Sequence, residues 1–382
     1  MDDLINIRHH LHAHPELSGE ENETRMCIMR RLEGMGITQV RNTSGNHSIL
    51  AEIHKSGSGP VVLFRCELDA LPIAEINDFS HRSVRPNIAH KCGHDGHMVI
   101  MLGFIRNIIK NPPGQGTILA LFQSAEETGE GAEAIIKSGI LDRYSIDHVF
   151  ALHNIPGYPL GSVICRPGSF TPAVESISIE LQGRTSHAGE PEKGINPAGV
   201  LGHIITHLNG LHNPDKSSPE YCVSTPIHIQ MGEEAYGTSA GHAWIRYTFR
   251  TWTNERLNQL KRSIEQEVKR AVSMKEGLQY STEWKQPFNS NNNHEDAVTL
   301  VRMAAHRNQL AYIEKEDPFD WGEDFGLFTE QYKGAMFGLG AGENCPALHN
   351  PDYDFPDELI APGIRMFEQI SRSILPGPDS PD

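Results

Sequence analysis

The run Lys91-Cys92-Gly93-His94-Asp95-Gly96-His97 constrains this chain more than any other stretch. It brings together a thiol, a carboxylate and two imidazoles, and its two glycines allow the backbone to turn tightly. Residues 98–109 follow with a strong apolar stripe, which predicts a helix. The sequence therefore places potential metal ligands on a loop at a helix start, where a rigid scaffold can aim them into a cleft.

Length and charge limit the class of protein. The 382 residues exceed what one hydrophobic core usually organises, so we expect two domains. A formal net charge of -16 disfavours nucleic acid and anionic membranes as partners, and no apolar run is long enough to span a bilayer. The acidic start lacks the pattern of a secretory signal, and the six cysteines are scattered, so we expect a cytoplasmic protein with reduced thiols.

Strands and helices alternate in the first part of the chain. Apolar runs at 48–53, 61–64, 117–122 and 148–152 predict strands, and residues 98–110 and 131–138 predict helices between them. The pattern favours an α/β fold with a mostly parallel sheet and right-handed crossovers.

The pattern changes near residue 170. Apolar and polar residues then alternate as in half-exposed strands, and the order of elements to residue 285 is β-α-β-β-α-β, typical of a ferredoxin-like module. A helical pattern of the first kind resumes at 295–308. We therefore expect a catalytic domain of residues 1–170 and 286–382, with an inserted lid or dimerisation domain of residues 171–285.

Ligands of open parallel sheets bind beyond the carboxyl ends of the strands, and metal-type side chains follow the predicted strands of the first domain. After the strands come Asp69, Glu126, Glu127, His153 and His349, and at the helix entry stand Cys92 and His94. They come from five segments on the same predicted edge, so a shared site explains them better than coincidence. A set of thiolate, imidazole and carboxylate suits divalent Zn, Mn, Co or Ni.

Adjacent Glu126 and Glu127 suggest a division of labour. One carboxylate can bind metal while the other takes a proton from water, since metal binding lowers the pKa of water from about 15.7 to near 7. Other interpretations stay open at this stage. A lone cysteine is more often a small buried hydrophobe, and paired glutamates often mark an exposed helix start.

The remaining histidines have simpler interpretations. The N-terminal histidines 9, 10, 12 and 14 are expected to form a surface helix face rather than a metal site. His97 lies one turn into the predicted helix from His94, so we expect it to pack or to support the ligands.

Eight stretches match a known family in order and span almost the whole chain. They are 8–18 (RHHLHAHPELS), 65–72 (RCELDALP), 92–97 (CGHDGH), 123–127 (QSAEE), 151–153 (ALH), 183–188 (GRTSHA), 322–325 (GEDF) and 348–351 (LHNP). Together they resemble the amidohydrolase branch of the M20 metallopeptidase family, which includes hippurate hydrolases, N-acyl amino acid amidohydrolases and auxin-conjugate hydrolases.

The resemblance implies a zinc-exopeptidase-like catalytic domain that holds two divalent metal ions of uncertain identity. Their ligands would be Cys92, His94, Glu127, His153 and His349. Glu126 would be the general base, and Asp69 would orient a ligand from behind. His187, in the inserted domain, would stabilise the oxyanion in the active site of a partner subunit, because the family's insert also forms its homodimer.

Some positions depart from the family pattern. Cys66 and Glu67 stand where the family usually has Ala and Asp, and residues 232–239 replace an Asn-Val-Ile-Pro-like segment that helps to hold substrate. The residues after His187 also differ. These changes leave the metal chemistry intact and leave the choice of substrate open.

The sequence thus predicts a metal-dependent hydrolase that cleaves the amide bond of N-acyl amino acids or related small conjugates. A dipeptidase or aminoacyl peptidase of the same fold is one alternative. A catalytically silent binding protein is another, although a binder has no need of Glu126. Arg250 is a candidate anchor for the substrate carboxylate, with a surface salt bridge as its simpler role.

Overall fold

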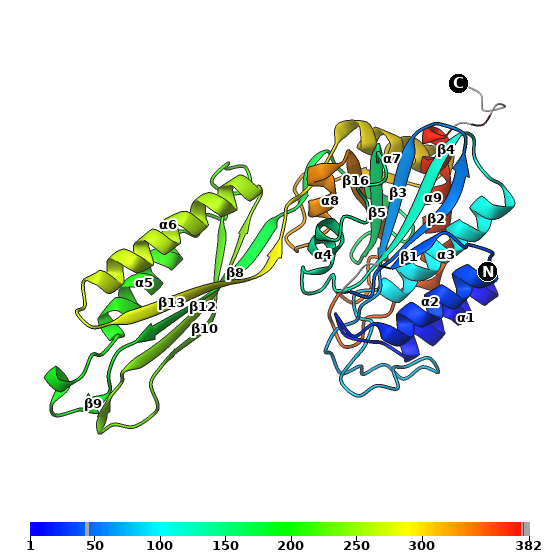
Figure 1. Cartoon of the computed structure of the whole chain (residues 1–382). Coiled ribbons are helices and arrows are strands. Elements are labelled where there is room, and N and C mark those ends of the chain that lie inside the picture. Colours follow the sequence, from blue (N-terminus) through cyan, green and yellow to red (C-terminus); the bar gives the residue numbers. More distant parts are fainter. Residues whose placement is uncertain (43–45, 376, 378–382) are drawn as a thin grey trace. The chain divides into compact units, whose positions relative to one another are not determined.

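The computed structural model describes residues 1–42, 46–375 and 377 (Figure 1). The chain forms two compact units. The first consists of Met1–Phe170, Asn291–Glu316 and Glu323–Asp382, and the second consists of Thr171–Ser290 and Asp317–Gly322. The second unit is therefore an insertion that also receives a short segment from the later part of the chain.

The first unit is built on an eight-stranded sheet with the order β1-β2-β4-β3-β5-β16-β6-β15. Its strands are β1 (Val40–Asn42), β2 (Ile49–Ser56), β3 (Val61–Glu67), β4 (Gly116–Gln123), β5 (His148–Ile155), β6 (Val163–Cys165), β15 (Tyr312–Glu314) and β16 (Gly334–Gly340). The central strands β4, β3, β5 and β16 run parallel, whereas β2 pairs antiparallel with β4. The predicted mostly parallel sheet is confirmed.

Helices cover this sheet. They are α1 (Asp2–Ala13), α2 (Asn22–Gly34), α3 (His94–Lys110), α4 (Gly131–Lys137), α7 (Glu295–Arg307), α8 (Gly326–Gln331) and α9 (Ile360–Ile374). Helix α3 is apolar on nearly all sides because it packs against α1, α9 and β3. Phe64, Phe104 and Phe367 meet at the centre of this core, with ring centroids 4.8 Å apart for Phe64–Phe104 and Phe64–Phe367.

The second unit is a four-stranded antiparallel sheet with two helices on one face (Figure 1). Its strands are β8 (Ala173–Gln182), β10 (Val223–Met231), β12 (His242–Thr251) and β13 (Gln279–Phe288), and its helices are α5 (Ala198–Gly210) and α6 (Asn254–Ser273). Ile177, Ile179 and Leu181 are buried at alternate positions of β8 and face the helices' core. The order β8-α5-β10-β12-α6-β13 confirms the predicted ferredoxin-like pattern.

Short pairs of strands complete the fold. The chain leaves the first unit through β7 (Gly168–Thr171) and returns through β14 (Asn291–Asn293), and these two strands pair with each other. In the second unit, β9 (Ser186–His187) pairs with β11 (Thr238–Ser239). Among the described residues, no helix combines the length and apolar character needed to cross a membrane.

The expectation that the N-terminal histidines form a surface face is wrong for His12. His12 is buried, and its ring nitrogens lie 3.0 Å from carboxylate oxygens of Asp95 and Glu75. Burial lowers the pKa of His12, but these two hydrogen bonds outweigh it and raise the pKa to about 9. Arg8, one turn earlier on α1, is buried beside Asp95 in the same way, so charged residues here mark a buried face.

Candidate metal centre and active site

The candidate site lies at the edge of the first unit's sheet where the central parallel strands end. Asp69 follows β3 by two residues, Glu126 and Glu127 follow β4, and His153 lies near the end of β5. His349 is in the loop after β16, and His94 begins α3. Because these strands are parallel, their carboxyl ends place all of these side chains on one edge.

The predicted ligands come together in overlapping groups whose ligand atoms all lie within 4.8 Å of one another. The groups are Cys92–His94–His153, Cys92–Glu127–His349 and His94–Glu126–Glu127. Cys92 Sγ lies 3.4 Å from His153 Nε2. Glu127 Oε1 is 3.9 Å from His94 Nε2, and Glu127 Oε2 is 3.6 Å from His349 Nε2. Side chains more than 250 positions apart in sequence thus share one centre.

Several atoms of this centre fit a divalent cation. His94 Nε2 and Glu127 Oε1 are buried and make no hydrogen bond within the described part of the chain. Buried polar atoms are normally paired, so such atoms indicate a missing partner. Thiolate, imidazole and carboxylate groups are the ligands that first-row divalent ions accept. The residues present therefore fit a metal ion.

Two glycines allow the loop to reach this geometry. Gly93 has φ +93°, and a Cβ atom there would lie 2.5 Å from Asn154 Oδ1. Gly96 packs so closely on the Phe355 ring that a Cβ would lie 2.5 Å from it. Both positions require glycine, one for its backbone conformation and both for space.

Asp69 holds both His94 and the Glu127 backbone. The Nδ1 atom of His94 lies 2.9 Å from the backbone oxygen of Asp69 and 3.3 Å from its Oδ1, so Nε2 is left to face the other ligands. Asp69 Oδ2 accepts hydrogen bonds from Ser18 Oγ and from the Glu127 amide. This geometry is the one expected of a residue that orients a ligand from behind.

The site carries more negative charge than its buried surroundings tolerate alone. Burial and the charges of Glu323 and Glu127 raise the pKa of Glu126 well above its usual range. Burial raises the pKa of Glu127 to about 7, and burial with the neighbouring glutamates raises the pKa of the Cys92 thiol. Burial lowers the pKa of His94, but Asp69 and Glu67 outweigh it and raise the pKa to about 10. A divalent cation would supply the positive charge that these ligands lack.

His97 belongs to a hydrogen-bond network behind Cys92. Its Nδ1 lies 2.7 Å from Glu67 Oε2, and its Nε2 lies 2.5 Å from Asn154 Oδ1. Asn154 Nδ2 donates to the Cys92 backbone oxygen at 3.1 Å and to the Tyr353 hydroxyl at 2.6 Å. His97 thus makes the contacts of a supporting residue. Sequence reasoning missed Asn154, and its position directly after His153 was the only signal.

The GEDF stretch forms a second buried network. The Arg65 guanidinium is fully buried and contacts Glu67, Glu323 and Asp324, at 2.9 Å for Glu323 and 2.6 Å for Asp324. Asp324 Oδ2 also accepts hydrogen bonds from Gln123 Nε2 at 2.6 Å and from the Ala132 amide at 2.9 Å. Asp324 therefore holds both ends of the loop that carries Glu126. The sequence marked this stretch without indicating its role.

Two predicted residues lie in the second unit. His187 is exposed on β9, and its Nδ1 accepts a hydrogen bond from the Gly189 amide at 3.0 Å. Arg250 on β12 donates from Nε to the backbone oxygen of Asp320 at 3.1 Å. Burial lowers the pKa of Arg250. Arg250 thus already has a partner within its own unit, and the roles of both residues stay predictions.

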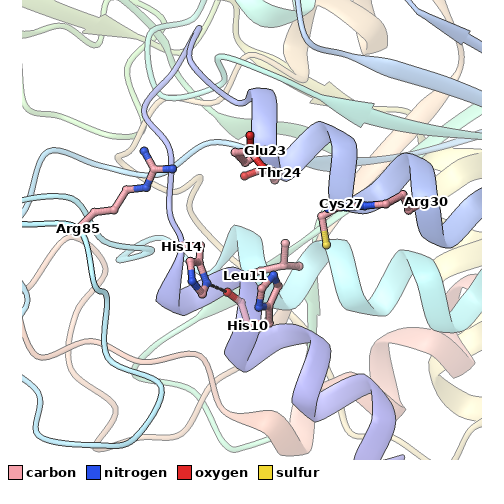
Figure 2. Close-up of a pocket in the computed structure, with 8 residues that line it drawn as sticks. All are labelled: His10, Leu11, His14, Glu23, Thr24, Cys27, Arg30 and Arg85. Carbon is pink, nitrogen blue, oxygen red and sulfur yellow. Dashed lines mark hydrogen bonds between the residues drawn. The ribbon is translucent and has the colours of Figure 1, made fainter.

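A cavity of about 350 Å³ lies elsewhere in the first unit, between α1, α2 and the loop of Arg85 (Figure 2). Its lining residues are His10, Leu11, His14, Glu23, Thr24, Cys27, Arg30 and Arg85. None of the predicted metal ligands is among them. Within the described residues, neither His10 nor His14 belongs to a group of metal-type ligands.

Comparison with known proteins supports this picture. The sequence profile described as Peptidase family M20/M25/M40 matches residues 63–373. An N-acetyl-L-cysteine deacetylase from Bacillus subtilis is 32% identical over 379 residues, covering 97% of this chain and 88% of the relative. An N-acetyldiaminopimelate deacetylase from Bacillus velezensis is 29% identical over 374 residues, covering 96% of this chain and 98% of the relative.

A solved structure matches the whole chain. It is a Bacillus subtilis protein described as a dinuclear metal binding peptidase from the M20 family. The TM-score is 0.83 with 26% sequence identity, and the match covers 98% of each chain. Its description is consistent with the fit of a divalent metal to the ligand groups in the first unit.

Proposed function

We propose that this chain, which belongs to peptidase family M20/M25/M40, is a metal-dependent hydrolase. It would cleave the amide bond of N-acyl amino acids or related small conjugates. One observation carries this proposal: Cys92, His94, Glu127, His153 and His349 converge beside the additional carboxylate of Glu126. The similar deacetylases act on N-acetylated amino acids according to their names. An enzyme of this class needs both a ligand set and a separate base.

The ligand groups support two metal positions. One position would use Cys92, His94 and His153, and the other would use Cys92, Glu127 and His349. The ligand types accept Zn, Mn, Co or Ni. When bound, such ions act as Lewis acids on a carbonyl oxygen and lower the pKa of water.

Glu126 is the proposed general base. It is buried, and its Oε2 lies 3.9 Å from His94 Nε2, so it borders the ligands. Glu126 would take the proton of the attacking water and then give a proton to the departing amine. Asp69 would fix the orientation of the His94 ring, because its backbone oxygen and its Oδ1 both contact His94 Nδ1.

The second unit would supply a homodimer interface and His187. Strand β10 is an edge of its sheet, and Ile227, Ile229 and Met231 expose apolar side chains along it. Unpaired edges with apolar residues readily pair with another chain. His187 is exposed on the same unit and would donate to the developing oxyanion in the partner's site.

The test is a substrate panel with the full-length protein purified without chelator and supplied with Mn or Zn. The panel contains N-acetyl and N-benzoyl amino acids together with dipeptides. Hydrolysis of the acyl amino acids in preference to the dipeptides supports the proposal. Preference for dipeptides would favour a peptidase, and metal binding without any turnover would contradict the proposal.

A further inference from the structure

The loop between β4 and α4 is held by its backbone amides. Carboxylates from distant parts of the chain accept these hydrogen bonds. The Ala125 amide donates to Glu21 Oε1 at 2.8 Å, and the Glu127 amide donates to Asp69 Oδ2 at 2.9 Å. Glu126 lies between these two anchored amides, so its direction depends on them.

Ala125 has an unusual backbone conformation. Its φ is +54°, in the left-handed region that residues other than glycine rarely adopt. Such a conformation persists only where surrounding contacts impose it. The bond to Glu21 is the contact that the Ala125 amide makes, and Ala125 directly precedes Glu126. The Ala125 carbonyl is held separately, since it accepts from the Gly131 amide at 3.0 Å. Release of the Ala125 amide would therefore change φ of Ala125 and, through it, the direction of Glu126.

Glu21 does not serve the helix that it begins. It occupies the N-cap position of α2, yet its side chain makes no cap hydrogen bond. Glu16 performs that task instead, accepting from the Glu23 amide at 3.2 Å and from the Thr24 amide at 2.7 Å. The Glu21 side chain is fully buried, and Oε1 also accepts from the Gly19 amide at 3.0 Å.

We propose that Glu21 is a positioning residue for the general base. This inference rests on the proposed function, because it assigns Glu21 a role only if Glu126 acts as the base. Glu21 acts through the Ala125 amide, which fixes the left-handed turn that directs Glu126 toward the ligands. The role depends on an acceptor oxygen within hydrogen-bond distance of the Ala125 amide.

Two substitutions separate the effect of the length of the Glu21 side chain from the effect of its charge. Glu21→Gln keeps the length and an acceptor oxygen, and the amide nitrogen replaces Oε2, which makes no hydrogen bond within the described residues. Glu21→Asp keeps the charge but withdraws the oxygen from Ala125. We expect kcat to fall at least about tenfold in Glu21→Asp with KM within about twofold, and Glu21→Gln to stay within about threefold of the parent.

A second measurement does not depend on activity. Hydrogen exchange in metal-free protein reports whether the amides of residues 123–132 remain protected. Exchange of this segment is expected to be faster in Glu21→Asp and unchanged in Glu21→Gln. Adding Ala125→Gly to Glu21→Asp should restore part of kcat, because glycine adopts the left-handed conformation without help.

Glu16→Asp is the matched control, since it shortens a neighbouring buried carboxylate that also accepts backbone amides. It should lower Tm and leave kcat unchanged. Equal losses of kcat in Glu16→Asp and Glu21→Asp would overturn the inference. Unchanged hydrogen exchange of residues 123–132 in Glu21→Asp, or a loss of bound metal from Glu21→Asp, would also overturn it. If the parent protein hydrolyses nothing in the panel, the proposed function fails, and the exchange data still test the link between Glu21 and Ala125.

Discussion

The two units bury different kinds of side chains. The second unit has an apolar core, and among its described residues Glu175 is the one buried charged side chain, paired with Lys261 at 2.6 Å. The first unit buries Arg8, Arg65 and Lys91 together with many acids and histidines around the ligand groups. A charge in a core is unfavourable unless it is paired, and each of these three cations contacts a buried carboxylate, so the first unit depends on complete charge networks.

The contrast between the charged interior of the first unit and the apolar core of the second is tested first by Glu126→Gln. This substitution changes a buried acid of the first unit and has the largest expected effect. The amide keeps the shape of the carboxylate but accepts no proton, so kcat should fall by about 10³–10⁴-fold with metal content unchanged. Glu130→Gln, at an exposed position of the same loop, is the control and should keep full activity. A Glu126→Gln enzyme as fast as the parent would show that the base is another group.

Arg65→Met tests whether the buried charges of the first unit depend on one another. It leaves three buried carboxylates without their shared cation and should destabilise the first unit by about 3–5 kcal/mol. Lys285→Met in the second unit breaks an exposed ion pair with Glu283 and should cost about 1 kcal/mol or less. Urea unfolding with hydrogen exchange of β3 and β8 measures both, and equal losses would remove the contrast between the units.

His187→Ala tests whether the second unit contributes to chemistry. Loss of an oxyanion donor should lower kcat by about 10²-fold or more while leaving the metal in place. Mixing Glu126→Gln with His187→Ala subunits should restore about a quarter of the parental activity, since half of the dimers are then mixed and one site in each mixed dimer has both intact residues. Mass spectrometry shows whether the subunits have exchanged. If they have exchanged and activity does not recover, His187 does not act across subunits.

The last prediction concerns pH and the buried histidine of α1. The pKa of His12 is about 9 in the folded protein and near 6.5 when unfolded, so folding favours its protonated form. The stabilisation is complete below pH 6.5 and is lost as pH rises through 9, with a size on the order of 3 kcal/mol. Urea midpoints measured from pH 6 to pH 9.5 should fall in the parent and stay flatter in His12→Gln. Parallel curves would contradict this role.

The sequence predicted that the candidate metal ligands would lie close together because most of them follow an apolar strand. Glu127, His153 and His349 lie at or after the ends of β4, β5 and β16, which run parallel through β3, while Cys92 and His94 stand at the start of α3. The element order of the second unit was likewise predictable, since Ile177, Ile179 and Leu181 alternate with polar residues.

The supporting residues could not be predicted in this way. Glu21 acts on the backbone of a residue 104 positions away, and no periodic pattern marks such a contact. Asn154 and Asp324 are common polar residues whose importance comes from the three partners that the fold brings to each side chain. His12 was misread because a charged residue on a helix usually faces water, and here Asp95 and Glu75 make the buried position favourable.

The position of β16 affects how the molecule is made. This strand lies between β5 and β6 in the sheet, although it follows both of them in the chain. A nascent chain that has emerged from the ribosome only as far as residue 333 lacks an internal strand as well as His349. The sheet therefore closes, and the candidate metal ligands come together, only after residues 334–349 have emerged.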